Sequence, residues 1–137
     1  MVSGAIGTGL AQGLLAESVI VRIVEEGLAL SEYNGRRVLV VIPDHTRSCP
    51  LDVMFRLICA RLLPVTSQLD FLVALGTHPA MSEEMIYKRV GITAEEHRRQ
   101  YRKVRFFNHA WNDPAHLTNV GRLREEESAE LTHGLLR

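Results

Sequence analysis

The sequence predicts an α/β fold, a three-layer, mostly parallel sheet flanked by helices. Short apolar runs with many β-branched residues alternate along the 137 residues with stretches of helical periodicity. Chains that alternate strands and helices in this order build mostly parallel sheets covered by helices. A chain of this length buries one core. We therefore expect one Rossmann-like α/β domain over residues 1–137.

The first elements are a lead-in, a helix, a turn and a strand. Residues 1–14 carry no charge and are rich in Gly and Ala, which indicates a loosely ordered start. Residues 16–30 place apolar side chains at helical spacing with charged side chains largely opposite. Asn34-Gly35 predicts a turn. The continuous apolar run 38–42 is typical of a strand covered on both faces.

Capping residues and prolines delimit the later elements. Pro50 fits the first turn of a helix over 51–63, and a second strand is expected within 70–76. Ser82 is expected to be the N-cap of the next helix and Gly91 to end it. Thr93 and Glu96 have the spacing of a capping box for a helix up to about Tyr101. A third strand over 104–108, a turn in HAWNDP and an amphipathic helix within 122–136 complete the prediction.

Composition argues against several classes of function. Sixteen basic residues balance sixteen acidic ones, so the chain lacks the basic excess that nucleic-acid binding needs. No apolar run approaches the ~20 residues of a membrane span, and the N-terminus lacks the features of a signal peptide. Cys49 and Cys59 lie ten residues apart on an expected helix, too far for a disulfide. We expect a cytoplasmic protein with no nucleic-acid or membrane partner.

Reactive side chains follow both early strands. Asp44, His45, Thr46 and Arg47 come after the first, and Thr77 and His78 come after the second. Ligands of open parallel sheets bind outside the carboxyl ends of the strands. If the two strands are neighbours, a guanidinium that can clamp an anion and an imidazole that can move a proton face one hollow. The alternative is that these are turn formers, caps and surface ion pairs.

Other candidate motifs are weaker. The GAIGTG stretch at 4–9 has neither a preceding strand nor a following lysine, so it is not a phosphate loop. The histidines and cysteines do not form a zinc pattern, and no metal ligand is assigned. We expect Cys49 to be a small apolar filler and Trp111 to anchor its loop by packing.

Three motifs in fixed order carry a resemblance to a known family. They are the Asp-His-Thr-Arg loop at 44–47, the ALGTHPAMSEEM stretch at 74–85 and HAWNDP at 109–114. Over about residues 37–121 the chain resembles the N-terminal domain of the nickel-dependent lactate racemases, a group of 2-hydroxyacid racemases and epimerases. Residues 1–30 match weakly and are expected to be an extension.

The resemblance implies a mechanism and site roles. Family members hold a nickel pincer nucleotide, which accepts a hydride from the α-carbon of the substrate while histidines take the hydroxyl proton. On this pattern His78 is the catalytic histidine and Asp44 helps to organise the site. The implied substrate-binding residues are Arg47, Thr46, Thr77 and His45.

The resemblance covers only part of such an enzyme. The second catalytic histidine, the cofactor-attaching lysine and the nickel-binding histidine of the family lie beyond the matched region. We therefore expect the N-terminal domain of a larger two-domain racemase, inactive by itself, without attached cofactor, whose partners are a 2-hydroxyacid and a missing C-terminal domain. Two alternatives remain: a stand-alone module that binds a small anion through Arg47, and a structural domain. An exposed strand edge is also expected to promote self-association of the fragment.

Overall fold

Three parallel strands form the centre of the molecule. The computed structural model describes residues 5–136, so the first four residues of the expected lead-in lie outside it. The strands are β1 (Arg37–Pro43), β2 (Gln68–Ala74) and β3 (Val104–Asn108), in the order β1-β2-β3. The helices are α1 (Glu17–Gly27), α2 (Leu30–Tyr33), α3 (Leu51–Leu62), α4 (Glu83–Arg89), α5 (Ala94–Gln100), a short 3-10 helix (Pro114–His116) and α6 (Glu125–Leu131). The α/β class and the parallel sheet are thus confirmed.

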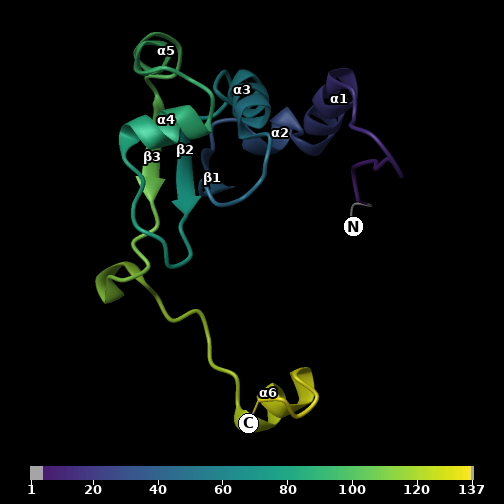
Figure 1. The fold of residues 1–137 in the computed structure, drawn as a ribbon, viewed down its shortest axis with the longest axis vertical. Helices are drawn as coiled ribbons and strands as arrows, with labels where there is room; N and C mark the ends of the chain where they lie inside the picture. The colour runs from purple at the N-terminus through teal and green to yellow at the C-terminus, as the bar shows by residue number, and fades with distance from the viewer. Residues whose placement is uncertain (1–4, 137) are drawn as a thin grey trace.

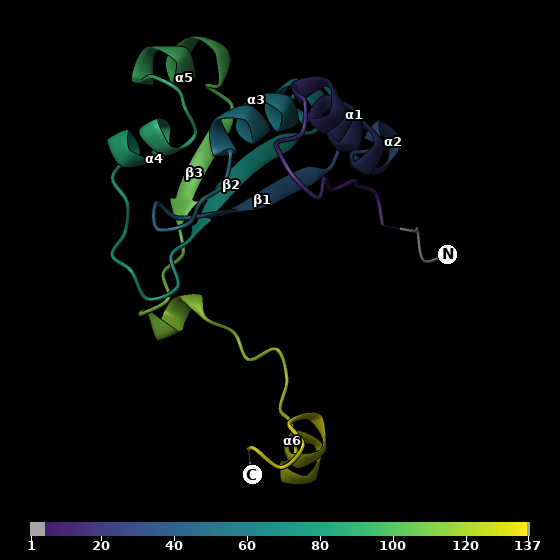
Figure 2. The same cartoon turned by 45° about the vertical axis from the view of Figure 1, so that its right-hand side comes forward.

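One face of the sheet carries the hydrophobic core. Phe71 of β2 lies beside Phe106 of β3 in the strand register, and Phe55 of α3 packs on both rings with centroids 5.1 and 5.8 Å away. Tyr87 of α4 and His97 of α5 also pack on the Phe106 ring. Helices α3, α4 and α5 therefore cover the same face of the sheet (Figure 2), and α1 and α2 contact α3.

The opposite face of the sheet is open in residues 5–136. Leu39 and Val41 of β1 are 54% and 61% exposed, and Phe107 of β3 is 43% exposed. The expectation that the run 38–42 is covered on both faces is therefore wrong for the described residues. They form two of the three expected layers, the sheet and the helices on one of its faces. The run is apolar on both sides, but the helices approach it from one side only.

An ion pair crosses the open face between two strands. Asp70 of β2 and Arg105 of β3 are partners in the parallel register, and two bonds of 2.9 and 2.7 Å join them. The Gln68 side chain donates a third hydrogen bond to Asp70 at 2.7 Å. The pair lowers the pKa of Asp70, mainly through the bond from Arg105. Because Asp70 is 8% exposed, these bonds supply the partners that a buried carboxylate needs.

Turns and caps follow the sequence closely. Gly35 and Gly91 have φ angles of +69° and +70°, as expected for a turn and a helix stop. Thr93 and Glu96 form the predicted capping box of α5, and the Ser82 side chain caps α4. The short helix α2, by contrast, was not predicted; it ends at Tyr33, directly before the predicted Asn34-Gly35 turn.

The C-terminal segment departs from the rest of the fold. After the 3-10 helix the chain extends away from the sheet and ends in α6 (Figure 1). Leu123, Leu131 and Leu135 are 67%, 68% and 86% exposed, so the apolar side of the predicted amphipathic helix faces solvent. No helix among residues 5–136 has both the length and the apolar character needed to cross a bilayer.

Candidate functional site

The loops after β1 and β2 lie side by side at one edge of the sheet. The two strands pair in parallel along their full length, from Arg37 with Gln68 to Pro43 with Ala74. The prediction that the first two strands are neighbours is thus confirmed. The polar residues of both loops therefore emerge at the carboxyl edge of the sheet, where α/β proteins bind ligands.

Asp44 joins the two loops through its carboxylate. Its Oδ1 accepts hydrogen bonds from the backbone N–H of Thr46 at 3.0 Å and from the Thr46 hydroxyl at 2.6 Å. Its Oδ2 lies 2.5 Å from Nδ1 of His78 on the second loop. Asp44 is only 3% exposed. The bond from Thr46 and then the bond to His78 hold the pKa of Asp44 well below its usual range.

This arrangement fixes the proton on His78. Since Asp44 is ionised at neutral pH, its oxygen accepts and the Nδ1 of His78 must carry the proton. In the neutral imidazole Nε2 then keeps a free lone pair. The His78 side chain is 45% exposed, so it stays accessible while Asp44 is buried beneath it. A carboxylate that orients an imidazole in this way prepares it to act as a general base.

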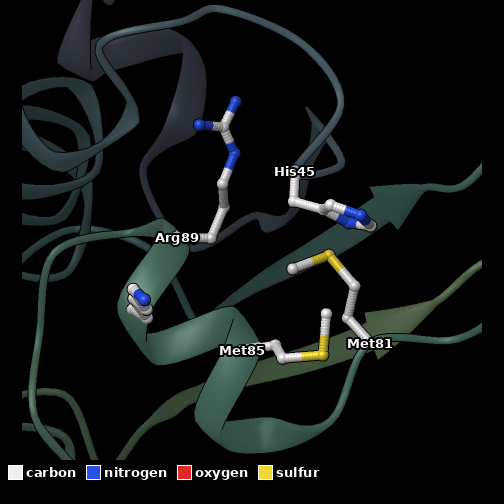
Figure 3. Close-up of a pocket in the computed structure, with 5 residues that line it drawn as sticks. His45, Met81, Met85 and Arg89 are labelled. Atoms are coloured by element: carbon white, nitrogen blue, oxygen red, sulfur yellow. The ribbon is translucent and has the colours of Figure 1, made fainter.

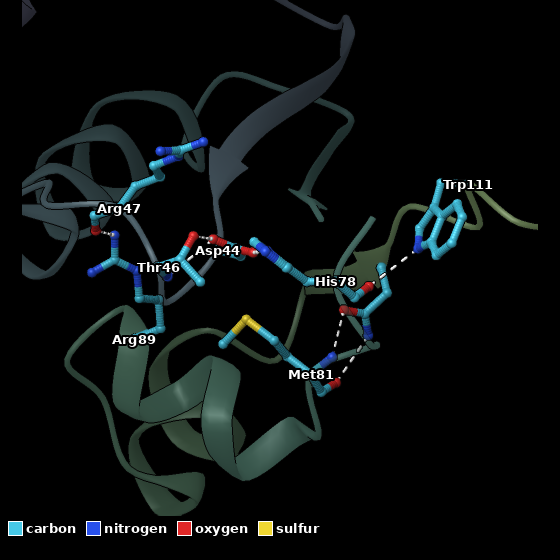
Figure 4. Close-up of polar contacts among 8 residues, drawn as sticks. Asp44, Thr46, Arg47, His78, Met81, Arg89 and Trp111 are labelled. Carbon is cyan, nitrogen blue, oxygen red and sulfur yellow. Dashed lines mark hydrogen bonds and ion pairs between the residues drawn. The ribbon is translucent and has the colours of Figure 1, made fainter. Parts of the chain in front are cut away.

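A cavity of about 530 Å³ brings most of the predicted site residues together. It is lined from β1 and its loop by Asp44, Thr46 and Arg47, and from the second loop by Thr77 and His78. Arg47 and Thr77 are exposed. Figure 4 shows Asp44 between Thr46 and the ring of His78, with Arg47 on the side of the first loop. The guanidinium and the imidazole thus share one hollow, as the sequence predicts.

His45 is the one predicted residue that does not line this cavity. It lines a neighbouring pocket of about 410 Å³ with residues of α4 and the loop before it (Figure 3). Along the chain Asp44 and Thr46 face the first cavity while His45 between them faces the second. Its assignment to substrate binding stays a prediction, and it is not supported by the position of the side chain.

Asn108, the last residue of β3, and Trp111, shortly after it, hold the second loop, and sequence reasoning gave them no such role. The Trp111 indole N–H donates to the backbone carbonyl of His78 at 3.1 Å. The Asn108 side chain accepts from the Met81 N–H at 3.0 Å and donates to the Met81 carbonyl at 2.9 Å. Trp111 was expected to pack, and it does lie against the core. Its place in HAWNDP, directly after a strand adjacent to β2, was the available signal.

Cysteines and metal-ligating groups do not add to this site. Cys49 and Cys59 are free, as predicted, and burial raises the pKa of the Cys59 thiol to about 12, so it is not a nucleophile. Within residues 5–136, histidine, cysteine, aspartate and glutamate side chains form no group of three or more that could hold a metal ion.

Comparison with known protein families identifies one family. The model of the lactate racemase N-terminal domain matches residues 16–135, including the helix that we expected in a weakly matched extension. A crystal structure of a protein from Thermotoga maritima is similar, with 30% sequence identity and a TM-score of 0.65. The similarity covers 89% of this chain but 29% of that protein, so the chain spans under a third of its length. No curated protein gives a significant match.

Proposed function

Because the chain belongs to the lactate racemase N-terminal domain family, we propose that it is the substrate-binding and proton-transfer half of a 2-hydroxyacid racemase or epimerase. The observation that carries the proposal is the Asp44–His78 pair in the same cavity as Arg47. The fold and the family support the class of protein; the reaction is our inference from this geometry.

The chemistry of the pair suits the substrate. A 2-hydroxyacid carries a carboxylate beside the carbon that changes configuration. Arg47 offers a planar cation that can bind this carboxylate through two parallel hydrogen bonds. His78, with its Nδ1 proton held by Asp44, presents Nε2 to take the proton of the neighbouring hydroxyl. Asp44 stabilises the imidazolium that forms, and Thr46 keeps the carboxylate in place.

The nickel pincer nucleotide that the family implies does not fit the described residues alone. When bound, such a cofactor supplies the hydride acceptor. Residues 5–136 contain no group of ligands for nickel, and no lysine lines the His78 cavity. We therefore assign no residue of this chain to holding it and derive no step through it. We propose that the remainder of a larger two-domain protein contributes that part and that this chain is inactive alone.

Substitutions in the complete protein test the proposal. We predict that His78→Ala reduces racemisation of an enantiopure 2-hydroxyacid by about 10²-fold or more, because the proton acceptor is lost. Chiral chromatography of the product measures it, and circular dichroism of the variant confirms the fold. Racemisation that continues unchanged in His78→Ala would refute the assignment of His78 as the base.

Arg47→Ala should weaken binding of the carboxylate by about 2–3 kcal/mol, as expected for loss of a charge-assisted pair.

The same variants separate the alternatives. If the domain only binds a small anion, Arg47→Ala should abolish binding while His78→Ala has no effect on any measured property. If the domain is structural, neither variant should change binding or turnover. Titration of the 137-residue chain with lactate by calorimetry supplies the binding measurement without the rest of the enzyme.

A further inference from the structure

Basic side chains gather in the pocket between the loop after β1 and helix α4. His45, Lys88 and Arg89 line it together with Met81 and Met85, and none of the lining residues is acidic. Figure 3 shows His45 across the pocket from α4, with both methionines below it. The chain as a whole has zero net charge, so this pocket is a local concentration of positive charge.

Arg89 holds a hydrogen-bond donor that the protein itself does not use. Its Nη2 donates to the backbone carbonyl of Arg47 at 2.7 Å. Its Nε is buried and has no hydrogen-bond partner, and within residues 5–136 it is the one buried side-chain N or O atom of that kind. Arg89 and His45 line the same pocket, and both lie above the two methionines in the view of Figure 3. Buried donors are nearly always paired, so this Nε is a donor left for an acceptor that displaces the atoms covering it.

A role in helix stability does not account for the whole arrangement. Lys88 and Arg89 lie in the last turn of α4, where cations complement the helix dipole. That effect needs no contribution from the loop after β1. It therefore explains neither the position of His45 in the pocket nor the unpaired Nε of Arg89.

We propose that this pocket binds an oxyanion, a phosphate or a carboxylate, carried on a small organic group. Arginine and lysine are the side chains best suited to hold such anions. Met81 is 4% exposed and Met85 is 42% exposed, so they form an adaptable apolar wall for the organic part. The site is separate from the His78 cavity, because no residue lines both. The bond from Arg89 to the Arg47 carbonyl links them.

Titration of the 137-residue chain tests the site directly. The probes are phenyl phosphate, benzoate and inorganic phosphate at constant ionic strength, followed by NMR of the His45 ring and the methyl groups of Met81 and Met85. We expect saturable shifts of these signals with phenyl phosphate or benzoate. Whichever of these two probes binds more tightly identifies the preferred oxyanion, phosphate or carboxylate. Inorganic phosphate that binds as tightly as phenyl phosphate would overturn the organic part of the proposal.

The two lysines of the sequence provide matched variants. Lys88→Ala should weaken binding about fivefold or more. Lys103 is an exposed lysine directly before β3, and Lys103→Ala should leave binding unchanged. Equal losses in both variants, or no saturation with any probe, would overturn the site. His78→Ala should bind normally. Because none of these measurements depends on turnover, their failure is distinguishable from failure of the proposed function.

Discussion

The two faces of the sheet have similar side chains and very different surroundings. On the covered face Phe71 is 1% exposed and packs between Phe55 and Phe106. On the open face Phe107, one residue from Phe106, is 43% exposed, and the Arg105 guanidinium lies over its ring at 5.4 Å from the centroid. The comparison teaches that residue type alone does not reveal a core position. The helices decide which face becomes the core.

The largest expected effect separates the two faces. Phe71→Ala should lower the free energy of unfolding by about 3–5 kcal/mol, because a fully buried ring leaves a cavity. Phe107→Ala should cost about 1 kcal/mol or less, the value of an exposed cation–π contact. Urea unfolding followed by circular dichroism measures both. If Phe71→Ala does not fold, Phe71→Leu provides the same comparison with a smaller loss of unfolding free energy. Equal losses in the two positions would show that the open face is buried in solution.

The second effect tests how tightly the helices pack over the covered face. A Cβ on Gly91, at the end of α4, would lie 2.5 Å from the Cβ of Asp52 on α3. Gly91→Ala should therefore cost about 2–3 kcal/mol, from backbone strain and the clash together. Gly35 has nearly the same φ angle but no neighbour within 4 Å of its Cβ position, so Gly35→Ala should cost about 1 kcal/mol. Thermal unfolding compares them. Equal shifts in Tm would refute the close contact.

The smallest effect concerns Asp44 at the carboxyl edge of the sheet and depends on pH. Its pKa in the folded protein is depressed, whereas an unfolded aspartate titrates near ~3.9. The stability that its ionised form contributes is therefore complete above ~3.9 and is lost as pH falls toward the folded value. Asp44→Asn should be less stable than the original chain near neutral pH, and the difference should shrink below about pH 4. Melting temperatures from pH 2 to 7 measure this.

A second variant isolates the cause of that depression. Thr46→Val removes the hydroxyl that donates at 2.6 Å and leaves the carboxyl in place. The acid-induced loss of stability should then begin at higher pH than in the original chain. An unchanged pH dependence in Thr46→Val would assign the depression to His78 instead.

The sequence predicted the order of elements well because local signals determine them. Pro50, Ser82, Gly91 and the Thr93–Glu96 box mark helix ends where the structure has them. The convergence of Arg47 and His78 was predictable because neighbouring parallel strands end at one edge.

Features that depend on distant contacts were not predictable. The run 38–42 is equally apolar on both sides, so its pattern does not tell which side the helices cover. The orientation of His45 away from the first cavity depends on the backbone of a short loop. The bond from Arg89 to the Arg47 carbonyl joins residues 42 apart in the chain, and no local pattern indicates it.

The Asp70–Arg105 pair has a consequence for how the strands find their alignment. Parallel strands lack a hairpin to set their alignment, and the connection between β2 and β3 contains α4 and α5. A slip of one residue would turn Arg105 to the covered face, among aromatic rings, and would leave the carboxylate of Asp70 without its cation. Misaligned strands would thus incur an electrostatic penalty, and the pair favours the native alignment.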